Sequence, residues 1–114
     1  MAIQQEVGSL EVGLHADLVL LGVDATDPYR SAIHAMPQDV RLVVLGGVPS
    51  YGDPAILGSL PGVPASCFDL DACGAARRVC WSDTPEGPVT PDGIRGVIDG
   101  FYADGAEQLF DCSP

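Results

Sequence analysis

The sequence contains no lysine, and five arginines supply all of its cationic side chains apart from the two histidines. Sixteen carboxylates oppose them and give a formal net charge of −11 at pH 7. A surface of this sign repels phosphate backbones and anionic headgroups, so we expect neither nucleic acid nor a membrane as a partner. The acidic residues are scattered along the chain, which indicates a solvated surface rather than a site.

Long hydrophobic runs are also missing. No stretch of about 18 apolar residues occurs, so no membrane-spanning helix is predicted. The opening residues, MAIQQEVG, lack the basic and apolar regions of a signal peptide, and the cytoplasm is therefore the expected location. Nor does the chain contain a GxSxG elbow, an HExxH motif, a glycine-rich phosphate loop or an EF-hand loop.

Closely spaced cysteine pairs are absent as well. The four cysteines, at positions 67, 73, 80 and 112, form no CxxC motif and lie far from both histidines in the sequence. Zinc sites normally show closer ligand pairs, so we assign no metal ligand. We expect free structural thiols in a reducing compartment, and the alternative is a disulfide between two of Cys67, Cys73 and Cys80.

Two short apolar runs are present, residues 16–23 (ADLVLLGV) and residues 40–45 (VRLVVL). Both are rich in Val and Leu and are bounded by Gly, Pro or Asp, which is typical of buried strands. Gly46 and Gly47 follow the second run and suit a two-residue hairpin turn in which both residues take positive φ. The pattern predicts a strand, a loop of about sixteen residues and then a hairpin. The length of the first run favours a strand with neighbours on both sides and cover on both faces.

We interpret the polar residues around the first run as structural rather than catalytic. The carboxylate of Asp17 is expected to cap amides of the turn at residues 8–13, because no second acid, base or nucleophile lies near it. His15 and His34 are interpreted as packed or solvent-facing side chains. Residues 29–35 are expected to form one or two helical turns within the long loop.

One segment also resembles a known family. The stretch GSLEVGLHADLVLL, followed by DPY and by VRLVVLGGVPSYG, resembles the segment after the catalytic barrel in the amidohydrolase superfamily, which includes imidazolonepropionases and cytosine deaminases. The residues that fit the family pattern are Gly8, Ser9, Leu10, Glu11, Gly13, Ala16, Asp17, Leu18, Val19, Gly47 and Tyr51. Leu14 replaces the family's common lysine. The resemblance covers residues 8–52, less than half of the 114-residue chain.

The resemblance implies a fold and the absence of a catalytic site. In that family the domain beside the barrel is composite, with strands from both ends of the chain, and it supports the barrel. We therefore expect a mainly β fold with minor α, a small β-sandwich or β-roll with one C-terminal helix. The family's metal ligands all lie outside the matching segment, so we assign no catalytic, cofactor-binding or metal residue and expect no cofactor. A (β/α)8 barrel needs at least about 200 residues, so we expect residues 1–114 to form a single small domain, with the family-like segment at 8–52 and a tail at 53–114.

The tail contains weaker signals for strands and one clear signal for a helix. Asp53 followed by Pro54 predicts a short helix over residues 53–60. Residues 67–81 predict two short strands with a break at Gly74, in which Arg77 and Arg78 pair with acids; a bound phosphate or carboxylate is the alternative.

The clear helix begins after Thr90, its expected N-cap, and Pro91. Its apolar stripe has helical spacing and consists of Ile94, Val97, Ile98, Phe101 and Tyr102. The three glycines within the helix lower its intrinsic stability. Tertiary packing is therefore expected to hold it.

Three functional hypotheses follow. The preferred one is a non-catalytic structural or accessory domain that resembles the C-terminal part of an amidohydrolase-like metal-dependent hydrolase without its barrel. The second is a free-standing module that binds a small ligand or a protein, with a cleft near Tyr51, Trp81 and the Arg77–Arg78 pair. The third is an enzyme in its own right, which requires a cysteine with a histidine, or several carboxylates, to converge in space. As a partner we expect a second copy, in a homodimer through an open sheet edge or the helix face, and a catalytic barrel domain is the other candidate.

Overall fold

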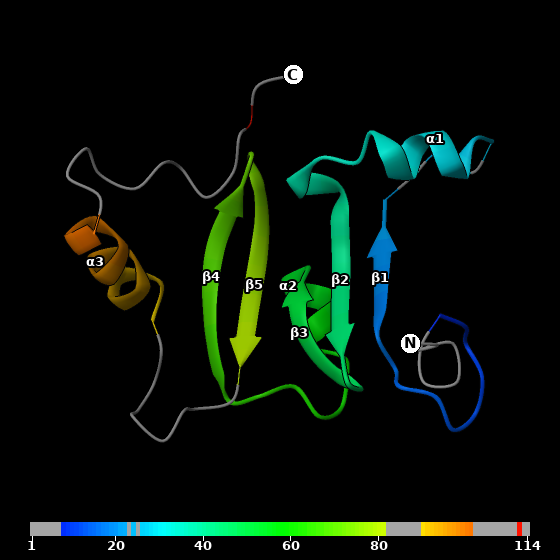
Figure 1. Cartoon of the computed structure of the whole chain (residues 1–114), viewed down its shortest axis with the longest axis horizontal. Helices are drawn as coiled ribbons and strands as arrows, with labels where there is room; N and C mark the ends of the chain where they lie inside the picture. The colour runs from blue at the N-terminus through cyan, green and yellow to red at the C-terminus, as the bar shows by residue number, and fades with distance from the viewer. Residues whose placement is uncertain (1–7, 23, 25, 82–89, 102–111, 113–114) are drawn as a thin grey trace.

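The structure, a computed structural model, describes residues 8–22, 24, 26–81, 90–101 and 112. Figure 1 shows one sheet with helices around it. The strands are β1 (Leu18–Leu21), β2 (Val40–Leu45), β3 (Val48–Gly52), β4 (Ser66–Ala72) and β5 (Ala75–Trp81). The helices are α1 (Pro28–Ile33), the single 3-10 turn η1 (Pro37–Asp39), α2 (Pro54–Leu57) and α3 (Pro91–Phe101).

The sheet is antiparallel throughout and has the order β1-β2-β3-β5-β4. The expected mainly β fold with minor α and a helix in the C-terminal part is confirmed. The described residues form one sheet, so the second layer that a sandwich requires is not seen in this part of the chain.

Two tight hairpins connect the strands. Gly46 and Gly47 link β2 to β3 with φ angles of 56° and 82°, which confirms the turn predicted from the glycine pair. Cys73 and Gly74 link β4 to β5 with φ angles of 55° and 83°, so the break predicted at Gly74 is a two-residue turn. The side chain of Asp71 holds this second turn by accepting a 2.8 Å hydrogen bond from the amide of Gly74.

Helix α2 covers one face of the sheet, which we call the helix face. The Asp53 carboxylate caps the helix by accepting from the amide of Ala55 at 3.0 Å, as the sequence predicts. Leu57 is buried and packs in the core with Leu42, Val44 and Cys80. Partly buried apolar residues surround this cluster: Leu18, Ile56, Leu60, Val63 and Cys67. Apolar burial is therefore concentrated where β2, β3 and β5 pass under α2.

A second set of apolar residues lies on the opposite face. Residues directly opposed across antiparallel strands share a face, and the pairings place one residue from each strand in a row across the sheet. In sheet order the row is Val19, Val43, Tyr51, Val79 and Phe68. The sheet therefore carries apolar side chains on both faces.

The prediction for the first apolar run is wrong in one respect. Its strand, β1, has only four residues and lies at an edge of the sheet, paired only with β2 among the described residues. Val19 and Leu20 are 58% and 48% exposed. The run is apolar along its length, but burial on both faces and both sides also depends on neighbours, and the described part of the chain supplies a neighbour on one side only.

Helix α3 begins as predicted, because the Thr90 hydroxyl accepts a 3.0 Å hydrogen bond from the amide of Gly93. Its apolar stripe is exposed, with Val97 at 62% and Phe101 at 81%. The described residues therefore supply little of the tertiary packing that we expected to hold this helix. Tyr102, the last residue of the predicted stripe, lies outside the described residues. None of the helices described is long and apolar enough to cross a membrane.

Candidate functional site

Among the described residues, β1 forms one outer edge of the sheet and β4 forms the other. The amide of Gly47 donates to the carbonyl of Ala16 at 3.0 Å, and the amide of Gly22 donates to the carbonyl of Asp39 at 2.7 Å. These bonds direct the backbone groups of the even-numbered residues toward β2 and the β2–β3 turn. Because successive residues of a strand alternate in direction, the amides and carbonyls of Val19 and Leu21 face the open edge.

Exposed apolar side chains border this edge at both ends. Figure 1 shows the segment 8–17 at one end of β1 and α1 at the other, both on the outer side of the sheet. Leu10 and Val12 in the segment are exposed, as are Tyr29 and Ile33 on α1. We call β1 together with these two flanks the β1 surface. An unpaired strand edge next to apolar side chains is a common feature of protein interaction sites.

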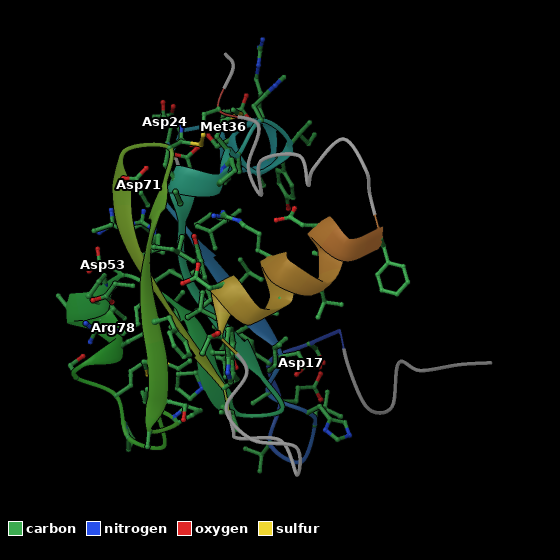
Figure 2. All side chains as sticks on the ribbon, turned by 90° about the vertical axis from the view of Figure 1, so that its left-hand side faces the viewer. Asp17, Asp24, Met36, Asp53, Asp71 and Arg78 are labelled. Atoms are coloured by element: carbon green, nitrogen blue, oxygen red, sulfur yellow. A yellow bond between two sulfur atoms is a disulfide. The ribbon has the colours of Figure 1, made fainter. Side chains whose placement is uncertain are left out.

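The carboxylate of Asp17 serves the hairpin rather than the turn we expected it to cap. It accepts a hydrogen bond from the amide of Gly46, so it fixes the β2–β3 turn against the start of β1 (Figure 2). No charged side chain lies within the four residues of β1 itself. The open edge is therefore apolar, although the chain as a whole is acidic.

A second carboxylate, Asp24, closes a local turn just after β1. It accepts from both the amide and the hydroxyl of Thr26, at 2.9 and 2.8 Å. These hydrogen bonds stabilise the charged form and hold the pKa of the Asp24 carboxyl below its ordinary value. The Asp24 carboxylate thus serves to stabilise this local turn.

The adjacent arginines point to opposite faces of the sheet. Arg78 lies on the helix face (Figure 2) and makes two bonds to Asp69, at 2.6 and 3.0 Å. Hydrogen bonding and charge lower the pKa of Asp69 and raise that of Arg78. The predicted acid pairing is confirmed for Arg78.

The prediction is wrong for Arg77, whose side chain is only 5% exposed. Its Nε donates to the carbonyl of Val40 at 2.8 Å, one terminal nitrogen donates to the carbonyl of Ala76 at 2.8 Å, and the other donates to the carbonyl of Gln38. The guanidinium thus binds three carbonyl oxygens and connects β5 to η1 and β2. The sequence offered no signal for this role, since nothing local distinguishes Arg77 from Arg78.

The alternative hypothesis placed Tyr51, Trp81 and the Arg77–Arg78 pair around one binding cleft. The structure does not bring all four side chains to one face of the sheet. Tyr51 and Trp81 lie on the face opposite α2, and the Trp81 ring packs against the Phe68 ring with centroids 5.3 Å apart. Burial raises the pKa of the Tyr51 phenol, and the nearby charge of Arg77 partly offsets that shift. Arg78 is on the other face, so the two guanidinium groups cannot bind one anion together.

All four cysteines are paired, and the prediction of free thiols is wrong. Cys67 pairs with Cys80 across the β4–β5 ladder, as the alternative reading of the sequence allowed. Cys73 pairs with Cys112, which joins the β4–β5 turn to the far end of the chain. Sequence spacing alone could not select this connectivity, because Cys112 is separated from Cys73 by 39 positions.

The described residues contain no group of three or more His, Cys, Asp and Glu side chains that could hold a metal ion. His15 and His34 are both exposed, in the segment before β1 and at the end of α1. Searches with family models, curated proteins and solved structures give no match to this chain. The β1 surface is therefore the candidate site that the structure itself supplies.

Proposed function

We propose that this chain is a non-catalytic accessory domain and that the β1 surface is where it joins its assembly. The observation that carries the proposal is the unpaired edge of β1, bordered at both ends by exposed apolar side chains. Such an edge gains hydrogen bonds and apolar burial when another strand pairs with it. The amidohydrolase resemblance supports the same interpretation, because β1 and the segment before it belong to the resembling residues.

The occupant we propose for this edge is a second copy of the chain. The outward groups of β1 are self-complementary: two antiparallel copies related by a two-fold axis at Val19 exchange both Val19 hydrogen bonds. In the same register the amide of Leu21 in each copy meets the carbonyl of Asp17 in the other. The pairing thus forms four main-chain hydrogen bonds without disturbing the β1–β2 ladder.

Repulsion between the two Asp17 carboxylates is weak in this pairing. Asp17 is two residues from the axis, or about 7 Å, so its two copies are about 14 Å apart. The Debye length at physiological salt is about 8 Å, so their repulsion is largely screened. Because each copy carries a net charge of −11, the dimer is expected to strengthen as salt concentration rises.

The same symmetry brings the flanks together. Because the strands are antiparallel, α1 of one copy lies at the same end as the segment 8–17 of the other. Tyr29 and Ile33 are then placed near Leu10 and Val12, four side chains that are exposed in the single chain. The apolar area buried by the flanks adds to that of the short strand pair.

Sedimentation equilibrium at micromolar concentration tests the proposal. We expect a species of twice the 11.8 kDa chain mass that dissociates on dilution. Val19→Asp should shift it to monomer, because two carboxylates then face each other at the axis. Val97→Asp, a matched change on exposed α3, should leave it unchanged.

Three outcomes are informative. Dissociation by Val97→Asp alone would move the interface to the exposed apolar stripe of α3. A monomer that resists both changes would exclude the second copy. In that case, binding of a separately expressed barrel domain to the β1 edge would still support the accessory role. Absence of that binding would refute the accessory role.

The location we propose is an oxidising compartment. Disulfides persist outside the reducing cytosol, and both pairs are formed in the structure. They weigh against the cytoplasmic location expected from the opening residues.

A further inference from the structure

The two disulfides have very different surroundings. Cys80 is 1% exposed and belongs to the core cluster under α2, so the Cys67–Cys80 bond lies partly inside the protein. Cys112 is exposed, and Cys73 is half-buried in the tight turn between β4 and β5. A reductant therefore reaches the Cys73–Cys112 bond more easily than the Cys67–Cys80 bond.

The Cys73–Cys112 bond also closes a loop that contains α3. The chain leaves β5 at Trp81, passes through α3, and returns to the β4–β5 turn at Cys112. Trp81 and the turn are at opposite ends of β5, a strand of seven residues, which corresponds to about 23 Å. Both ends of the segment that carries α3 are thus fixed to the same hairpin, and Figure 1 shows α3 beyond β4, on the side of the sheet away from β1.

Among the described residues, apolar packing covers α3 only in part. Val97 and Phe101 of its apolar stripe are mostly exposed, and Ile94 is 42% exposed. A helix of 11 residues with three internal glycines is marginal without tertiary contacts. The covalent link therefore restrains α3 where the apolar contacts among the described residues do not.

We propose that the Cys73–Cys112 disulfide is a redox-sensitive tether for α3, whereas Cys67–Cys80 is a permanent structural bond. A thiolate of a dithiol reductant attacks Sγ of Cys112, the Cys73–Cys112 bond breaks, and Cys73 leaves as a thiolate that takes a proton from water. The second thiol of the reductant then resolves the mixed disulfide and releases Cys112. Two electrons and two protons pass to the cysteine pair, and the reductant becomes a cyclic disulfide.

Reduction of the Cys73–Cys112 bond changes how α3 is attached to the sheet. The segment that carries α3 is then joined covalently to the hairpin at Trp81 alone, and its other end is released from the β4–β5 turn. The tether thus makes the position of α3 depend on the redox state, independently of the β1 surface.

Graded reduction with dithiothreitol, alkylation with N-ethylmaleimide and peptide mass spectrometry test the order of reduction. We expect Cys73 and Cys112 to be alkylated at a reductant concentration about tenfold lower than Cys67 and Cys80. Alkylation of Cys67 and Cys80 first, or of all four together, would overturn the assignment.

Hydrogen exchange tests the effect on α3. In the selectively reduced protein, amides of α3 should exchange about fivefold faster or more, while those of β2, β3 and β5 stay protected. The double variant Cys73→Ser/Cys112→Ser should reproduce this pattern without reductant. Unchanged exchange in α3 in both samples would show that the bond does not restrain the helix and would overturn the proposal.

Discussion

Replacing Arg77 by methionine should destabilise the protein far more than the same change at its neighbour Arg78. The two residues are adjacent, carry the same charge and lie in the same strand. They differ in surroundings: Arg77 is buried and binds three carbonyl oxygens, whereas Arg78 makes an exposed ion pair with Asp69. The pair of variants therefore isolates the buried contacts.

The loss of folding free energy expected for Arg77→Met follows from the hydrogen bonds that the substitution removes. Methionine preserves most of the apolar stem but removes the donors to the carbonyls of Gln38, Val40 and Ala76. A hydrogen bond that involves a charged group contributes about 1.5–3 kcal/mol, and such contributions are not additive when bonds share one side chain. A loss of about 3–4 kcal/mol is expected, a large part of the 5–15 kcal/mol that holds a typical domain.

Urea denaturation followed by Trp81 fluorescence measures the effect. Arg77→Met should lower the midpoint strongly, and Arg78→Met should lower it only slightly, because solvent screens the pair with Asp69. Arg77→Lys should be intermediate, since one ammonium cannot reach all three carbonyls. Equal midpoints for the two methionine variants would refute the role assigned to Arg77.

Four further predictions concern the turns, the chemistry and the pH dependence. Gly52→Ala should cost about 2–3 kcal/mol, because a Cβ there would lie 2.6 Å from the carbonyl oxygen of Arg41; an unchanged denaturation midpoint would contradict this close approach. Gly47→Val should cost more than about 1 kcal/mol because a β-branched residue resists positive φ, and thermal melting would show it. The purified chain, dialysed against a weak chelator, should carry no stoichiometric zinc by elemental analysis and should not hydrolyse amides, amidines or lactams; one metal per chain or steady turnover would refute the non-catalytic assignment. The lowered pKa of Asp69 stabilises the fold above its ordinary value of 3.8, and this stabilisation is lost as pH falls through the folded-state pKa, so the stability difference between the protein and Asp69→Asn should shrink in acid.

Local sequence chemistry predicted the turns and helix starts well. Gly46 and Gly47 identify the first hairpin because few residues accept positive φ. Asp53 and Thr90 identify helix starts because their side-chain oxygens accept bonds from free amides. These features depend on one to four neighbouring residues, so the sequence is enough to place them.

Features that depend on distant parts of the chain were not predictable in the same way. The carboxylate of Asp17 caps Gly46, 29 positions away, instead of the nearby turn. The guanidinium of Arg77 reaches carbonyls 37 and 39 positions away. Apolar composition gave β1 the appearance of a central strand, but its position at the edge is decided by which other strands pair with β2.

The disulfides add stability to a described fold that buries little apolar surface. Five hydrophobic residues are buried among those described, namely Leu42, Val44, Leu57, Ala72 and Cys80, and a core of this size leaves a domain only marginally stable. Loops of 13 and 39 positions correspond to about 3 and about 4 kcal/mol of stabilisation in the chain-entropy model. Because the net stability of a small domain is of the same order, loss of both bonds would remove most of it. A fold that depends on its disulfides to this extent supports the proposal that the chain works in an oxidising compartment.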